Sequence, residues 1–247
     1  MYLLSLKPAA WRWVSKTLLT ASSIVLAFFY PSSLVFWAIL LIFAVRSYLS
    51  QLEERKLYKS SFWLLFILTV LTGSLIQKET IIFKLFLAIF FSAMFFIKTG
   101  LGNLFFSRPK VIYDFFNSVL VITGVFVGLK LIHNLPPGFF WSILPLYFLV
   151  FFLIFKEVIA LETSNRHHLN IVSASLSFII GNILIILLLL PLNIFGQTGF
   201  IGLLFIILKN LIKRHKNGTL TAKFCLTQAS IFVVLTLLIF GTATWSI

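Results

Sequence analysis

The sequence predicts an all-α, polytopic transmembrane helix bundle of about nine spans, with no soluble domain. The first observation is composition, because 60% of the residues are hydrophobic and only 11% are charged. Typical soluble proteins have about 45–50% apolar and about 25% charged residues. The second observation is that long apolar runs fill most of the chain. The third is that Lys and Arg collect in alternate gaps between these runs, which is typical of repeated membrane crossing.

Charges, prolines and glycines divide the chain into the predicted spans, which form one integral membrane domain over residues 1–247. The spans are predicted at residues 17–30, 33–45, 60–76, 81–97, 111–131, 139–155, 171–192, 199–212 and 224–244. The eighth run is the weakest, because few apolar residues precede Lys209. Without that run the chain would have about eight spans.

The first two runs meet at Pro31, where two interpretations compete. A turn at Tyr30-Pro31-Ser32 would make a helical hairpin, since proline lacks an N–H and serine favours turns. One long kinked helix would instead place two basic clusters on opposite sides of the membrane. This arrangement is disfavoured, because basic loops tend to stay on the cytoplasmic side. The sequence therefore predicts the hairpin.

The basic loops also predict the orientation of the chain. An inside N-terminus and an outside C-terminus leave only Lys78, Lys84 and Lys130 on the outer side. We expect a bacterial inner (cytoplasmic) membrane location, an uncleaved first span, and contacts of the basic loops with anionic phospholipids at the cytoplasmic face. This topology explains the net charge of +14 without a nucleic-acid partner.

The fifth run carries a stripe of small and polar residues that share one helix face. The stripe contains Asp114, Asn117, Ser118, Gly124 and Gly128. The two glycines form a GxxxG pattern, which lets a second helix backbone approach closely. Asp114 can also complement the positive helix N-terminus and pair with a lysine one turn earlier.

A second stripe follows the seventh run and contains Asn170, Ser173, Ser177 and Gly181. Small and hydroxyl residues on an otherwise apolar helix favour the bundle interior. Two interpretations stay open: the stripes only pack helices together, or the cytoplasmic halves of the fifth and seventh runs frame a pocket.

The basic residues nearest the stripes are candidates for contacts with phosphate or lipid headgroups. They are Arg108, Lys110 and Arg166. No cofactor and no metal site is predicted, because Cys225 is the only cysteine and the adjacent His167 and His168 cannot readily bind one ion together.

Two classes of function fit these patterns, and no catalytic residue is assigned. The first is non-enzymatic: transport of a small, amphipathic or lipidic substrate, or a membrane subunit of a larger complex. The alternative is a membrane enzyme acting on a lipid-linked phosphate at the cytoplasmic face, with Asp114 and Asn117 as its polar groups. Few charges lie within the predicted spans, which disfavours ion-coupled transport of a charged solute.

Overall fold

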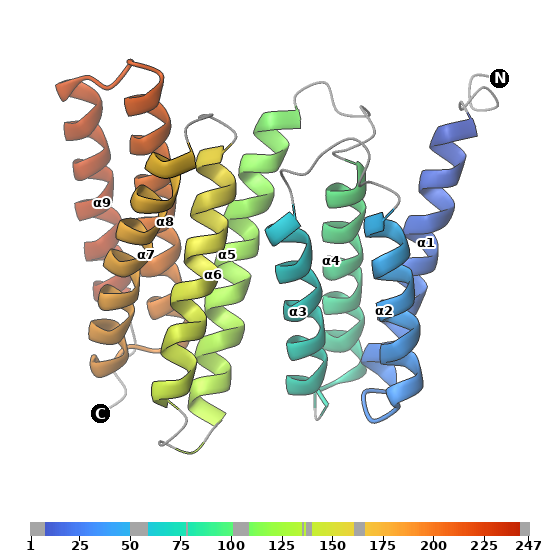
Figure 1. The fold of residues 1–247 in the computed structure, drawn as a ribbon. Helices are drawn as coiled ribbons and strands as arrows, with labels where there is room; N and C mark the ends of the chain where they lie inside the picture. The colour runs from blue at the N-terminus through green and yellow to red at the C-terminus, as the bar shows by residue number, and fades with distance from the viewer. Residues whose placement is uncertain are drawn as a thin grey trace. The chain divides into compact units, whose positions relative to one another are not determined.

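The structure is a computed structural model that describes residues 8–49, 59–77, 79–100, 109–134, 136, 140–160 and 166–242. Within these ranges the chain forms nine α-helices and no strand (Figure 1). The helices are α1 (Pro8–Phe29), α2 (Leu34–Leu49), α3 (Lys59–Leu75), α4 (Ile81–Gly100), α5 (Pro109–Asn134), α6 (Phe140–Ala160), α7 (Arg166–Leu189), α8 (Ile194–Lys216) and α9 (Ala222–Thr242). Each overlaps one of the apolar runs.

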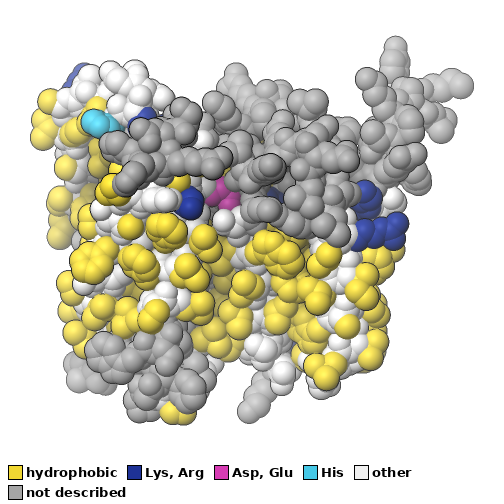
Figure 2. Space-filling view, viewed as in Figure 1, with side chains coloured by type: hydrophobic (Ala, Val, Ile, Leu, Met, Phe, Trp, Pro, Cys, Tyr) yellow, Lys and Arg dark blue, Asp and Glu magenta, His cyan; other side chains and the backbone are white. Residues whose placement is uncertain are grey.

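Five of the described helices are long and apolar enough to cross a membrane. These segments are Ile81–Lys98, Val111–Asn134, Leu169–Leu189, Ile194–Lys216 and Ala222–Thr242. Shorter apolar helices cover Val14–Phe29, Leu34–Arg46 and Ser60–Leu75. Figure 2 shows hydrophobic side chains across the middle of the face in view. This all-helical, lipid-compatible architecture is that of an integral membrane protein.

The chain divides into two compact units, residues Met1–Phe116 and Asn117–Ile247. In unit 1, α1 packs against α2 and α4, and α3 packs against α4. Its core contains edge-to-face aromatic pairs, with ring centroids 5.9 Å apart for Phe28 and Phe91 and 5.7 Å apart for Phe62 and Phe95. Such pairs add specific geometry to the burial of apolar area.

The predicted hairpin at Pro31 is confirmed, because α1 ends at Phe29 and α2 packs back against it. The Trp37 indole N–H donates to the Pro31 carbonyl oxygen at 2.9 Å, and the Ser33 amide donates to the Tyr30 carbonyl at 3.0 Å. These bonds satisfy carbonyl groups that a helix end leaves unpaired. The turn therefore has its own stabilising contacts.

In unit 2, α6 packs against α7 and α8, and α8 also packs against α7 and α9. Helix α5 contacts two of these neighbours where a side chain of one helix lies against a glycine of the other. A Cβ atom added at Gly128 would overlap the Tyr147 hydroxyl of α6. A Cβ atom added at Gly202 of α8 would lie 2.8 Å from the Cγ1 atom of Ile122 on α5.

Helix α8 is longer than the predicted span at 199–212. It begins after Asn193, whose side-chain oxygen accepts a hydrogen bond from the Gly196 amide at 2.7 Å, an N-cap. It ends in a basic last turn, where cations favour the negative end of the helix dipole. Gly218 then adopts a φ of 64° and closes the helix end, a conformation that glycine tolerates. These end contacts explain the added turns.

Candidate functional site

A lysine is buried inside unit 2, near the basic end of α8. Lys209 is only 6% exposed, and its Nζ atom donates a hydrogen bond of 2.7 Å to the Ser118 hydroxyl of α5. The Nζ atom also lies 6.0 Å from the centroid of the Phe205 ring. Burying an ammonium group costs free energy unless the group is paired, so the Ser118 hydroxyl and the Phe205 ring help to offset that cost.

The residue before Ser118 is Asn117, whose side chain is fully buried. Neither its amide nitrogen nor its amide oxygen has a hydrogen-bond partner within the described part of the chain. An unsatisfied buried polar group costs about 1–3 kcal/mol, so the fold gains nothing from this amide as it stands. Buried groups of this kind call for a specific explanation such as a ligand.

Glu157 of α6 lies at nearly the same depth as Asn117. The contact between Gly128 and Tyr147 fixes the register of α5 against α6. Asn117 lies about 16 Å from Gly128 along α5, and Glu157 lies about 15 Å from Tyr147 along α6 toward the same end. The Glu157 side chain is 5% exposed. We call Asn117, Ser118, Glu157 and Lys209 the polar layer.

Aromatic residues bound the polar layer on its deeper side. The rings of Phe155 on α6 and Phe205 on α8 have centroids 5.1 Å apart, and both side chains are fully buried. Further along, the Tyr147 hydroxyl donates to the Val125 carbonyl oxygen at 3.1 Å. The polar layer therefore lies toward one end of an apolar bundle.

Unit 1 contains a comparable lysine. Lys98 of α4 is 4% exposed and donates a hydrogen bond to the Ser61 hydroxyl of α3. Its Nζ atom lies 5.2 Å from the Tyr113 ring centroid and 5.4 Å from that of Phe116. Aromatic faces attract a cation, so these rings help to accommodate the ammonium.

The stripe on α5 contributes two of its residues to the polar layer, Asn117 and Ser118. Asp114 is half-buried and belongs to unit 1. Gly124 is buried, and Gly128 contacts Tyr147. The structure pairs Ser118 with α8 through Lys209.

The stripe on α7 is divided between a buried and an exposed face. Ser173 and Ser177 are fully buried, and their hydroxyls donate to the Leu169 and Ser173 carbonyls, each at 2.7 Å. Gly181 is buried, with open space where a Cβ atom would lie, whereas Asn170 is exposed. The two serine hydroxyls thus bond to their own helix.

Three further candidates lie outside the described side chains. They are Arg108, Lys110 and Arg166. Their predicted role in headgroup contacts stays a prediction. In the part of the chain that the structure describes, no group of three or more His, Cys, Asp or Glu side chains could hold a metal ion.

Sequence reasoning missed Lys98, Glu157 and Lys209, because it assigned them to the loops or to the basic cytoplasmic stretch. Helical spacing could have found the two lysines. Lys98 follows buried Phe91 and Phe95 by seven and three residues, and Lys209 follows buried Phe205 by four. Residues three, four or seven apart share one helix face, so both lysines belong to buried faces.

Comparison with known proteins found no matching family model, no similar curated protein and no similar solved structure. The fold and the side chains therefore define the class, an integral membrane helix bundle, and the polar layer is its candidate functional site.

Proposed function

We propose that this protein is a carrier for an amphipathic molecule with an anionic headgroup, and that the headgroup binds in the polar layer. The observation that supports this proposal most directly is the buried amide of Asn117, which has no hydrogen-bond partner among the described residues and precedes the Ser118 of the Lys209–Ser118 pair. A bound headgroup would supply the missing hydrogen-bond partners of that amide. The substrate's apolar part would remain among the apolar helices or in lipid.

The chemistry of the layer defines the headgroup. The Lys209 ammonium favours an anionic acceptor, and an asparagine amide can both donate and accept. The Glu157 carboxylate favours a donor such as a hydroxyl group. A phosphate next to hydroxyl groups satisfies all three, whereas a quaternary ammonium headgroup offers no donor.

The proposed orientation is the one that the basic loops predict, with the basic ends of the helices in the cytoplasm of a bacterial cell. The polar layer then lies near the cytoplasmic face, at the end of the helices that is closer to the headgroups of the inner leaflet. A role as a membrane subunit is compatible with this chemistry, because the carrier could act within a larger complex.

Reconstitution into liposomes tests the proposal. We expect the protein to accelerate the loss of leaflet asymmetry of a fluorescent phosphatidylglycerol, followed by dithionite quenching, and to move the matching phosphatidylcholine more slowly. Lys209→Gln should reduce the phosphatidylglycerol rate by about tenfold or more, since a hydrogen bond to a charged group contributes about 1.5–3 kcal/mol.

Lys213→Gln provides the matched control, because Lys213 lies one turn further along α8 and is only half-buried. This variant should keep the wild-type rate. Equal losses in both variants would mean that only the charge of the helix end matters, and the proposed headgroup site would be wrong.

Asp114→Asn separates the carrier from the alternative enzyme. A carrier that uses the polar layer should keep its phosphatidylglycerol rate within about fivefold, because a charge near a helix N-terminus contributes only about 0.3–1 kcal/mol. The measurement is the same liposome assay, combined with a melting curve in detergent. Loss of activity with unchanged melting temperature would instead favour a catalytic or proton-coupled Asp114.

A further inference from the structure

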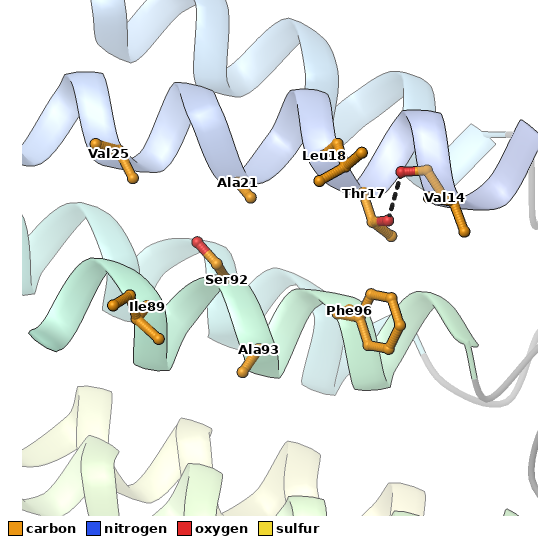
Figure 3. A pocket seen from close by; sticks show the side chains of 9 residues that line it. All are labelled: Val14, Thr17, Leu18, Ala21, Val25, Ile89, Ser92, Ala93 and Phe96. Carbon is orange, nitrogen blue, oxygen red and sulfur yellow. Dashed lines mark hydrogen bonds between the residues drawn. The ribbon is translucent and has the colours of Figure 1, made fainter. Parts of the chain in front are cut away.

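A groove runs along unit 1 between the antiparallel helices α1 and α4, with a volume of about 450 Å³ (Figure 3). Figure 3 shows side chains of both helices along it, from Val14 near Phe96 at one end to Val25 near Ile89 at the other. The lining residues are Val14, Thr17, Leu18, Ala21, Val25, Ile89, Ser92, Ala93 and Phe96.

The walls of the groove suit an apolar occupant. Only Thr17 and Ser92 contribute hydroxyl groups, and each donates to its own helix, Thr17 to the Val14 carbonyl at 2.8 Å and Ser92 to the Ala88 carbonyl at 2.6 Å. Ala21 and Ala93 leave room between the bulkier side chains. A hydrocarbon chain can fill this space without displacing a polar partner.

The length of the groove matches one leaflet of a bilayer. From Val14 to Val25 the axis of α1 advances about 17 Å. Half of the hydrocarbon thickness of a typical bilayer is about 15 Å. An extended acyl chain anchored at the membrane surface therefore fits along the groove from end to end.

The groove is also open to lipid along its sides. Leu18 is 64% exposed, Ile89 is 59% exposed and Phe96 is 41% exposed. An acyl chain can therefore enter the groove laterally from the surrounding leaflet, without passing through the protein.

Positive charge lies near the Val14 end of the groove. Lys16 immediately precedes Thr17 and is half-buried, so its ammonium can extend toward the membrane surface. Basic residues at the cytoplasmic surface attract anionic lipids. In the proposed orientation, this end of α1 lies in the cytoplasmic leaflet.

We propose that the groove between α1 and α4 binds one acyl chain of an anionic phospholipid of the cytoplasmic leaflet, with the lipid phosphate near Lys16. This lipid is a bound structural lipid of unit 1. The inference uses the proposed orientation but is independent of transport through the polar layer, which belongs to unit 2.

Photo-crosslinking of the full-length protein in liposomes tests this site. The probe is a phosphatidylglycerol with a diazirine in one acyl chain, present in trace amounts, and labelled peptides are mapped by mass spectrometry. We expect the labels to concentrate on 14–25 and 89–96. Ala93→Phe should lower that labelling to the level of the other lipid-facing helices, because the new ring fills the groove.

Ala38→Phe is the matched control, since Ala38 is also exposed in unit 1 but does not line the groove. It should leave the labelling unchanged. Lys16→Gln should remove a preference of about fivefold for phosphatidylglycerol over phosphatidylcholine probes, while chain labelling persists. Even labelling of all exposed helices, or labelling that Ala93→Phe does not alter, would overturn the proposal. Neither result depends on the liposome transport rate, so the two proposals can fail separately.

Discussion

Gly128→Leu should strongly destabilise the protein, because the buried Tyr147 side chain of α6 occupies the space beside Gly128 of α5. Even a Cβ atom at this position would overlap the Tyr147 hydroxyl, which donates to the Val125 carbonyl. Forcing extra atoms into a packed contact costs about 1–3 kcal/mol and sometimes more. We expect the melting temperature in mild detergent to fall by roughly 5–10 °C.

Gly181→Leu is the control for this effect. Gly181 also lies within a membrane-length helix, but nothing is found within 4 Å of the position of its added Cβ atom. Replacing glycine by leucine changes the intrinsic helix propensity by the same amount in both variants. Equal melting temperatures for the two variants would show that the Tyr147 side chain does not pack against Gly128 as the structure indicates.

The helices and the first hairpin could be predicted from the sequence because their signals are local. Apolar length predicts a membrane helix, and Pro31 with its neighbouring serines predicts a turn. Helix α8 extends beyond the predicted span at 199–212 for an equally local reason. Gly196 and Gly199 suggest a loop, but the Asn193 cap starts the helix ahead of both glycines.

The polar layer could be predicted only in part. Asn117 and Ser118 stand out, since polar residues are rare within an apolar run. Lys209 and Glu157 lie near helix ends, where charged loop residues are common. Their position along the chain therefore does not distinguish a buried charged residue from a loop residue that sets the membrane orientation. Their burial depends on which faces of α5, α6 and α8 meet. That choice is set by long-range packing, such as the contact of Gly202 with Ile122.

Asn117→Leu should have opposite effects on stability and on function. The Asn117 amide is fully buried without a hydrogen-bond partner among the described residues. Its desolvation therefore destabilises the fold, and no hydrogen bond offsets that cost. Leucine has the same number of side-chain heavy atoms in the same branching pattern, and it has no polar group to satisfy. We expect the free energy of unfolding to rise by about 1–2 kcal/mol, and the melting temperature by roughly 2–8 °C.

The same variant should transport fluorescent phosphatidylglycerol more slowly, because the headgroup loses a donor and an acceptor in the polar layer. Asn193→Leu is a contrasting control, since that asparagine caps α8 through the Gly196 amide. Its loss should lower stability by about 1 kcal/mol and leave the transport rate unchanged. A drop in melting temperature for Asn117→Leu as large as that for Asn193→Leu would contradict the proposal, because Asn117 would then stabilise the fold. Stabilisation with an unchanged transport rate would place the headgroup elsewhere. Only a more stable and slower variant fits an amide that is kept buried for a ligand.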